Sequence, residues 1–239
     1  FVESQDESGF NPRAVIEFQA NENLNLYASA SKGFRIGGIN GNLPVGLCGP
    51  ELEALGLTPS NASTFDSDEL WSYEVGIKST LLNNTVSVNA ATFFIDWTDI
   101  QQINRLACGF QFSDNAGEAE SKGFELEISA TPTDNLVVSL GVGYTDAKIT
   151  DTGGVAGVTK GDKIQGVPDW TVNGSAAYHF DVNDTWNGIV RADVNYYGDS
   201  FSSNNESSAA NQRLREAWNA VNLRATLVSD KYEITLFAD

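Results

Sequence analysis

The 239-residue sequence contains no methionine, one histidine, two cysteines and only 14 lysines and arginines, against 32 aspartates and glutamates. It also lacks a long hydrophobic run. The longest apolar stretch, around residues 136–144, is far shorter than the ~20 residues that a membrane-spanning helix needs. The formal net charge of −18 argues against nucleic acid as a partner, which would require a basic surface. Because no apolar run is long enough for a spanning helix, helical membrane proteins are excluded. A β-barrel is not, because a barrel strand needs an apolar residue only at every second position.

The residue types that carry catalysis are scarce. His179 is the only histidine and has no cysteine nearby, so no metal site is expected. No Gly-x-Ser-x-Gly motif occurs, and neither cysteine has a histidine partner in the sequence. Gly141-x-Gly143 lies inside a strand pattern and lacks the third glycine of a nucleotide-binding turn. The sequence therefore predicts no catalytic residue, no metal, no covalently bound cofactor and no enzyme activity.

Ten β-strand patterns follow one another, and the connections between them alternate strictly between short and long. Residues 24–31 show the period-2 pattern of a strand with two different faces: Leu24, Leu26 and Ala28 alternate with more polar residues. An outer-membrane barrel has short turns on its periplasmic side and long loops outside, whereas a soluble sheet has no reason to keep this asymmetry. The expected short connections are 21–23, 82–84, 131–135, 181–185 and 229–231, and the long ones are 36–69, 103–118, 150–167 and 200–216.

Period-2 alternation alone fits both a soluble sandwich and a membrane barrel. Two further features favour the barrel. The strand patterns at 70–81 and 85–102 are longer than the usual 5–6 residues and reach the ~9–11 that a tilted membrane strand needs. Aromatic residues gather near strand ends, as in the interfacial girdles of barrels; they include Trp71, Tyr73, Trp186, Tyr196 and Trp218. No helical stretch is expected.

Cys48 and Cys108 both fall in long connections. If these two loops lie on one face of the molecule, the cysteines can form a disulfide in an oxidising compartment.

Six segments resemble successive strands and loop starts of TonB-dependent outer-membrane receptors. They are NLNLYASASKGFRIGGIN (23–40), WSYEVGIKS (71–79), VNAATFFIDWTDIQ (88–101), NAGEAESKGFELE (115–127), GVPDW (166–170) and YEITLFAD (232–239). They occur in the order usual for the family and cover nearly the whole chain.

The resemblance implies an all-β fold, the antiparallel up-and-down transmembrane β-barrel of this family, which has about 22 strands and a plugged lumen. Residues 1–239 would form about ten of these strands, as the C-terminal portion of one barrel domain. The chain begins and ends as a fragment would, so the plug, its TonB-contacting box and the remaining strands are expected to lie outside it. Ten such strands cannot close, and both sheet edges would expose unpaired backbone.

The function implied by the resemblance is TonB-energised uptake of a ferric siderophore or similar nutrient complex across the bacterial outer membrane. The expected partners are outer-membrane lipid, a small-molecule nutrient complex (an iron chelate as the transported ligand) and a TonB-type energy-transducing complex that acts through the plug.

Ligand contacts are expected on the loops and at the outer rim, because binding residues concentrate on loops held by a rigid scaffold. An arginine fork can hold an anionic chelate, and aromatic rings can stack on planar ligand groups. Residues that face inward by strand alternation and lie near the outer rim are the expected contacts. They are Arg35, Trp97, Asp99, Gln101 and Tyr197, together with Phe110 and Phe112 from a loop.

Two other classes of protein remain open at this stage. The first is a passive porin-type barrel, which would have no plug. The second is a soluble all-β binding or adhesion module, in which apolar residues such as Val88, Leu126 and Leu223 would pack together in a dry core.

Overall fold

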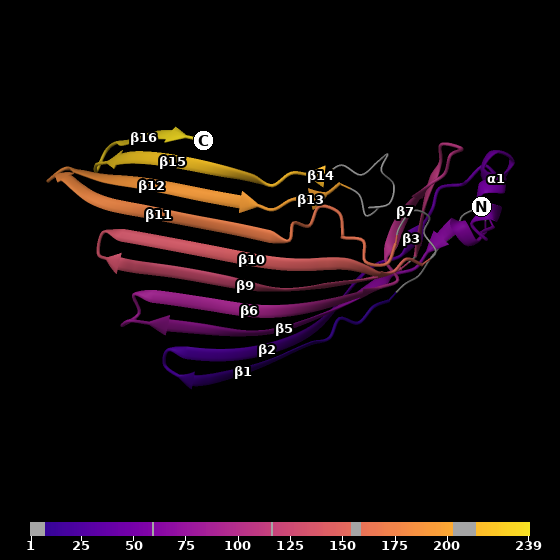
Figure 1. Ribbon diagram of the computed structural model, residues 1–239, viewed down its shortest axis with the longest axis horizontal. Helices are drawn as coiled ribbons and strands as arrows, with labels where there is room; N and C mark the ends of the chain where they lie inside the picture. The colour runs from indigo at the N-terminus through magenta and orange to yellow at the C-terminus, as the bar shows by residue number, and fades with distance from the viewer. Residues whose placement is uncertain (1–7, 59, 116, 154–158, 203–213) are drawn as a thin grey trace.

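The fold is described from a computed structural model that places residues 8–58, 60–115, 117–153, 159–202 and 214–239. Its main element is one sheet of ten antiparallel strands, in which each strand pairs with the strands before and after it in the sheet's chain order (Figure 1). This is the predicted up-and-down meander, and its first and last strands are the two open edges. The strands are β1 (Arg13–Asn21), β2 (Leu24–Arg35), β5 (Asp68–Leu81), β6 (Val86–Thr98), β9 (Glu118–Thr133), β10 (Leu136–Asp151), β11 (Trp170–Asn183), β12 (Trp186–Tyr197), β15 (Trp218–Val228) and β16 (Glu233–Ala238).

The short connections lie at one end of the sheet and the long ones at the other (Figure 1). Between β5 and β6, Leu82, Asn83 and Asn84 have φ of 52°, 56° and 67°. Asparagine tolerates this left-handed region, which explains its use in the tight turn. Between β11 and β12, the side chain of Asn183 accepts the N–H of Thr185 at 3.0 Å and so closes the turn. The predicted alternation of short and long connections is confirmed.

The two faces of the sheet differ in polarity. One, the apolar face, carries rows of aliphatic side chains that are directly opposed across the strands, such as Leu26, Ile77, Ala90 and Leu126. The side chains of this face are not enclosed: Leu223 is 52% exposed, and nothing in the described chain covers it. The dry core that a soluble sandwich requires is absent from this face of the described sheet. The opposite, polar face carries mainly Ser, Asn, Thr, Glu and Arg.

An aromatic band crosses the apolar face near the long connections. Its rings contact one another across neighbouring strands, as Tyr73 and Phe94 do with ring centroids 6.4 Å apart and Tyr144 and Trp170 do at 4.9 Å. The band consists of Trp71, Tyr73, Phe94, Phe124, Tyr144 and Trp170.

The prediction that Trp218 belongs to such a girdle is wrong. Trp218 is opposite Tyr197 on the polar face, where the two rings stack with centroids 4.6 Å apart. Trp218 is six residues before Arg224 on the same strand. Since side chains alternate between the two faces of a strand, the two residues lie on the same, polar face.

Two of the long connections fold together into a small structured unit beyond the end of the sheet, which we call the cap (the described residues of 36–67 and 99–117). It contains β3 (Gly38–Ile39), α1 (Val45–Ala54), the 3-10 helix η1 (Asn61–Ser63), β4 (Thr64–Phe65) and the hairpin β7 (Gln101–Arg105) and β8 (Gln111–Asn115). The remaining short strands, β13 (Ser200–Phe201) and β14 (Leu214–Arg215), pair within another long connection.

The cap corrects two predictions. A helix was not expected, yet α1 forms. Its glycines and internal Pro50 make it a poor helix by propensity, so its stability comes from burial of Cys48 and Leu52, one turn apart on the same side. No helix in the described residues is long and apolar enough to cross a membrane. The strand expected over 85–102 ends at Thr98 instead, because Asp99 adopts a φ of 54° and turns the chain into β7.

Candidate functional site

Three of the predicted site residues, Arg35, Trp97 and Gln101, converge on Asp68, the first residue of β5. Asp68 as a whole residue is 1% exposed. Its side chain lies on the polar face, at the ends of β2, β5 and β6 that adjoin the cap. The guanidinium of Arg35 donates from Nε to both carboxylate oxygens at 2.9 and 3.0 Å, and its Nη2 also bonds Asp68. Trp97 donates its indole N–H to the same carboxylate at 3.1 Å, and the guanidinium of Arg35 lies 5.0 Å from the Trp97 ring centroid.

Gln101 completes this arrangement from the cap side. Its main-chain N–H donates to Asp68 at 3.2 Å, and its side-chain amide donates to the carbonyls of Ile36 at 2.9 Å and Asp66 at 3.0 Å. Three of the predicted ligand contacts, Arg35, Trp97 and Gln101, are thus joined in one network that fixes the base of the cap to the sheet. Part of the Arg35 side chain remains accessible, at 53% exposure.

Electrostatics favour the charged form of Asp68, which lies beyond the aromatic band, at the end of the sheet that carries the cap. Burial by itself would raise the pKa of this carboxyl. The hydrogen bonds from Arg35, the Gln101 N–H and Trp97, with the charge of Arg35, outweigh burial and hold the pKa below its ordinary value. The same pair raises the pKa of Arg35, chiefly through the hydrogen bond to Asp68.

Two asparagine side chains stabilise the cap by forming hydrogen bonds with main-chain N–H and carbonyl groups of neighbouring segments. The amide of Asn40 donates to the carbonyl of Ser113 at 2.6 Å and accepts the Ser113 N–H at 2.7 Å. The amide of Asn115 accepts the Asp66 N–H at 2.6 Å and donates to the carbonyls of Asp66 and Asp99 at 2.9 Å each. Both satisfy main-chain groups that loops would otherwise leave unpaired.

Deeper in the cap, Cys48 of α1 is bonded to Cys108 of the β7–β8 turn, with a sequence separation of 60. Beside the disulfide, the carboxylate of Glu51 accepts the N–H groups of Ala107 at 2.9 Å and Cys108 at 3.0 Å. A small apolar core surrounds this junction and is formed by Leu43, Cys48, Leu52, Ala62, Leu106 and Phe112.

The remaining predicted contacts fall in different environments. Phe112 is 2% exposed in the cap core and is not accessible to a ligand in this structure. Phe110 is 43% exposed at the hairpin turn. Asp99 is exposed, and its main-chain carbonyl accepts a hydrogen bond from the side chain of Asn115. The structure therefore separates Phe110 and Asp99, which are accessible, from Phe112, which is not.

Tyr197 stands apart from the cap, at the end of β12, and is 40% exposed on the polar face. Its stacking partner Trp218, at the start of β15, is 53% exposed. Together the two nearly parallel rings, inclined by 18°, present a broad aromatic surface on the polar face of the sheet.

Sequence reasoning missed Asp68 and Trp218. Nothing in the sequence distinguishes Asp68 from the neighbouring Asp66, because the difference lies in which donors from distant segments reach it. Trp218 did carry a signal: it shares the strand phase of Asn222 and Arg224. Within the described chain, no group of three or more His, Cys, Asp or Glu side chains could hold a metal ion.

Comparison with known proteins gives a consistent result. The profile of the family described as TonB dependent receptor-like, beta-barrel matches residues 1–239. Among curated proteins, the metal-pseudopaline receptor CntO of Pseudomonas aeruginosa is 27% identical over 195 residues, which are 82% of this chain and 24% of that protein. The probable TonB-dependent siderophore receptor PiuA of Acinetobacter baumannii is 28% identical over 141 residues, 59% of this chain and 17% of PiuA. The chain thus spans about a quarter or less of the length of these relatives.

Among solved structures, the ferric yersiniabactin uptake receptor FyuA from Yersinia pestis aligns with a TM-score of 0.72 at 15% identity, over 94% of this chain and 31% of FyuA. The siderophore receptor PiuA from Acinetobacter baumannii aligns with a TM-score of 0.66 at 21% identity, over 94% of this chain and 30% of PiuA. At these identities the structural similarity establishes the fold.

Proposed function

The chain belongs to the TonB-dependent receptor family, as part of its β-barrel, and from this premise we propose that it forms one side of a receptor wall that takes up a siderophore-type iron chelate. The barrels of this family are outer-membrane transport receptors. The apolar face of the sheet then faces lipid, and the polar face lines the interior. The observation that carries the proposal is the polar inner face, topped by a cap and by the exposed Tyr197–Trp218 pair.

The names of the similar proteins support the class of cargo. CntO is a metal-pseudopaline receptor, PiuA a probable siderophore receptor and FyuA a ferric yersiniabactin uptake receptor. All three names indicate a small metal chelate. The residues proposed to meet it are the accessible ones on the inner side of the rim: Arg35, Asp99, Phe110, Tyr197 and Trp218.

Uptake by this receptor is expected to require the TonB-type energy-transducing complex, acting through a plug outside this chain. The experiment expresses the full-length protein in a strain lacking its other iron receptors. Growth on a panel of ferric chelates and accumulation of radiolabelled iron are then measured with and without the inner-membrane energy source. Loss of accumulation when TonB is deleted supports the proposal. Accumulation that persists without TonB would support a passive porin-type barrel instead.

Replacing Tyr197 and Trp218 with alanine is expected to weaken chelate binding about 10- to 100-fold, because each aromatic contact of this kind contributes ~0.5–1.5 kcal/mol beyond the apolar area it buries. Binding of the chelate identified by the growth assay is measured by fluorescence quenching on the full-length protein. The matched control is Tyr178→Ala with Tyr196→Ala, two tyrosines on the apolar face. Equal losses in both double variants would remove the Tyr197–Trp218 pair from the binding site.

A further inference from the structure

Asn40 of the cap is followed by Gly41, and an asparagine that precedes a glycine is especially prone to deamidation. The main-chain nitrogen of the glycine attacks the side-chain carbonyl carbon of the asparagine, because glycine has no side chain to hinder the approach. Ammonia leaves and a cyclic succinimide forms. Water then opens the ring to aspartate or isoaspartate, so the net reaction adds water and releases ammonia.

The sequence contains three Asn–Gly pairs, and the one in the cap is the pair that lies outside the ten-stranded sheet. They begin at Asn40, Asn173 and Asn187. Asn173 and Gly174 lie within β11, and Asn187 and Gly188 lie within β12. Both strands are paired on both sides, which holds their main chain extended and keeps each glycine nitrogen away from the preceding side chain. These two pairs are therefore expected to be inert.

In the closed cap, the side chain of Asn40 is held by three hydrogen bonds. Its amide nitrogen donates to the carbonyls of Ala62 at 3.0 Å and Ser113 at 2.6 Å, and its oxygen accepts the Ser113 N–H at 2.7 Å. Gly41, in contrast, is exposed. Because the hydrogen bonds fix the carbonyl carbon of Asn40, the nitrogen of Gly41 can attack it only after the cap has opened locally.

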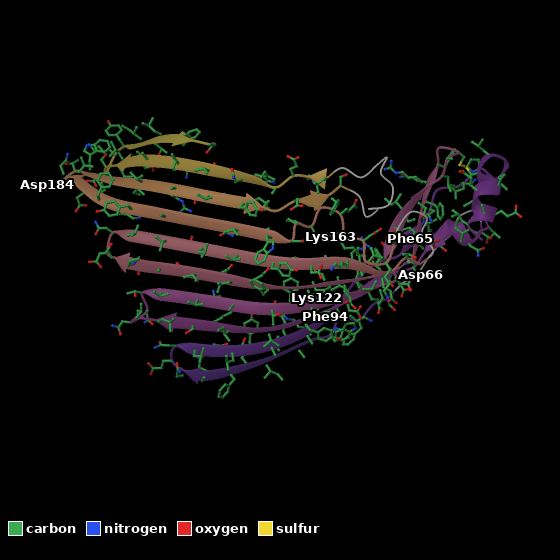
Figure 2. All side chains as sticks on the ribbon, viewed as in Figure 1. Phe65, Asp66, Phe94, Lys122, Lys163 and Asp184 are labelled. Carbon is green, nitrogen blue, oxygen red and sulfur yellow. A yellow bond between two sulfur atoms is a disulfide. The ribbon has the colours of Figure 1, made fainter. Side chains whose placement is uncertain are left out.

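The same hydrogen bonds join separate segments of the cap. Asn40 directly follows β3, which pairs with β4 at Gly38 and Phe65. Phe65 is labelled in Figure 2, at the end of the sheet that carries the cap. Ala62 belongs to η1 and Ser113 to β8, so the Asn40 amide connects the β7–β8 hairpin to the first connection of the cap.

The product of deamidation cannot form these contacts. A carboxylate has no donor to replace the amide N–H groups, so the carbonyl oxygens of Ala62 and Ser113 would face a negative charge. The isoaspartyl product also inserts one more carbon into the main chain, next to the 2.8 Å hydrogen bond from the Asn40 N–H to the carbonyl of Ser63. Conversion in the open cap therefore prevents the cap from closing again.

We propose that Asn40 is a site of spontaneous deamidation that requires opening of the cap and then keeps the cap open. Since the reaction is irreversible, the converted fraction increases with the total time that the cap has spent open. The proposal concerns the chemistry of the cap and not uptake, so failure of the transport assay leaves it unaffected.

The first test incubates the full-length protein in detergent in warm, mildly alkaline buffer and measures deamidation by mass spectrometry of its peptides. Conversion is expected at Asn40 and not at Asn173 or Asn187. Gly41→Ala is expected to prevent it and to keep the hydrogen bonds of Asn40, because an added β-carbon meets no other atom within 4 Å. Asp68→Ala, which loosens the base of the cap, is expected to accelerate conversion about 30- to 150-fold.

Hydrogen exchange before and after the incubation tests the effect on the cap. In the converted protein, amides in residues 36–40 and 111–115 are expected to exchange about 10- to 100-fold faster, since two carbonyl acceptors have lost their donor. Incubated Gly41→Ala should keep its protection, which separates the effect of conversion from that of heating. Asn40→Asp should show the faster exchange without any incubation.

Four results would overturn the proposal. They are equal conversion at Asn40, Asn173 and Asn187, a rate at Asn40 that Asp68→Ala leaves unchanged, unaltered exchange in the converted protein, and no conversion of Asn40 even in Asp68→Ala.

Discussion

Replacing Asp68 with alanine is expected to detach the base of the cap from the sheet and to lower the local stability of the cap by about 2–3 kcal/mol. The substitution removes a buried charged acceptor that binds Arg35, Trp97 and the Gln101 N–H. Breaking a fully buried ion pair costs ~3–5 kcal/mol, and the 53% exposure of the Arg35 side chain reduces that cost because water screens the charge left behind.

Hydrogen exchange on the full-length protein in detergent measures this effect directly. Amides in residues 36–58 and 99–115 are expected to exchange about 30- to 150-fold faster, as 1.4 kcal/mol corresponds to a factor of ten. Strands β10 to β12 should keep their protection. Asp66→Ala is the control, because Asp66 is exposed and holds its neighbours through its main-chain N–H and carbonyl. If both variants exchange alike, Asp68 is not the anchor of the cap.

Low pH is expected to destabilise the cap by protonating the carboxylate of Asp68. The pKa of Asp68 is lower in the folded cap than its ordinary value of 3.8, so the carboxylate contributes stability that is complete at neutral pH and is lost as the pH falls below 3.8. Exchange in the cap, corrected for the intrinsic pH dependence of amide exchange, is therefore expected to accelerate below that pH. In Asp68→Asn this acid-dependent step should disappear, since no proton is taken up at that position.

The meander was predictable because its signals are local. Period-2 alternation, asparagine-rich turns and aromatic strand ends are all read within a few residues, and a one-residue shift of register would put each apolar row on the wrong face. The strand phase of Arg224 contained the position of Trp218 on the polar face, but the aromatic character of Trp218 led to the girdle prediction, which is wrong. The fold class and the positions of the ten strands of the main sheet therefore follow from the sequence, whereas the short strands within the long connections do not.

The cap was not predictable in the same way, because its stability depends on contacts between segments far apart in the chain. The helix α1 contains two glycines and an internal proline and forms around Cys48 and Leu52, which pack against residues more than fifty positions away, such as Leu106 and Phe112. Asn40 likewise bonds Ser113 across 73 positions. Local helix propensity does not depend on partners so far away in the chain, so the sequence indicated only a long loop.

The accessible phenylalanine and the buried phenylalanine of the cap hairpin illustrate the same limit within the candidate site. Phe110 and Phe112 are two positions apart and of the same residue type, but Phe110 lies in the β7–β8 turn and Phe112 in β8. Phe112 fills the cap core, whereas Phe110 remains 43% exposed. Only the packing of α1 on the hairpin decides which of the two rings can meet a ligand.

Removing the Cys48–Cys108 disulfide with the pair Cys48→Ala and Cys108→Ala is expected to lower the stability of the cap by about 2–4 kcal/mol, the usual contribution of a disulfide that closes a long loop. Here it links positions 60 residues apart. The expected pattern of hydrogen exchange differs from that of Asp68→Ala. Protection should be lost first in α1 and the β7–β8 turn, while amides near Asp68 and Gln101 remain protected. Reduction of the unaltered protein should reproduce this pattern.

Glu51 provides the discriminating control, because it holds the same turn without a covalent bond by accepting the N–H groups of Ala107 and Cys108. Glu51→Ala alone should cost about 1–3 kcal/mol, since it leaves two main-chain donors without their acceptor. Combined with loss of the disulfide, the two effects should not add, because once α1 and the turn have separated there is no contact left for Glu51 to make. A strictly additive result would mean that helix and turn stay together without either link, and that the apolar core around Leu52 alone assembles the cap.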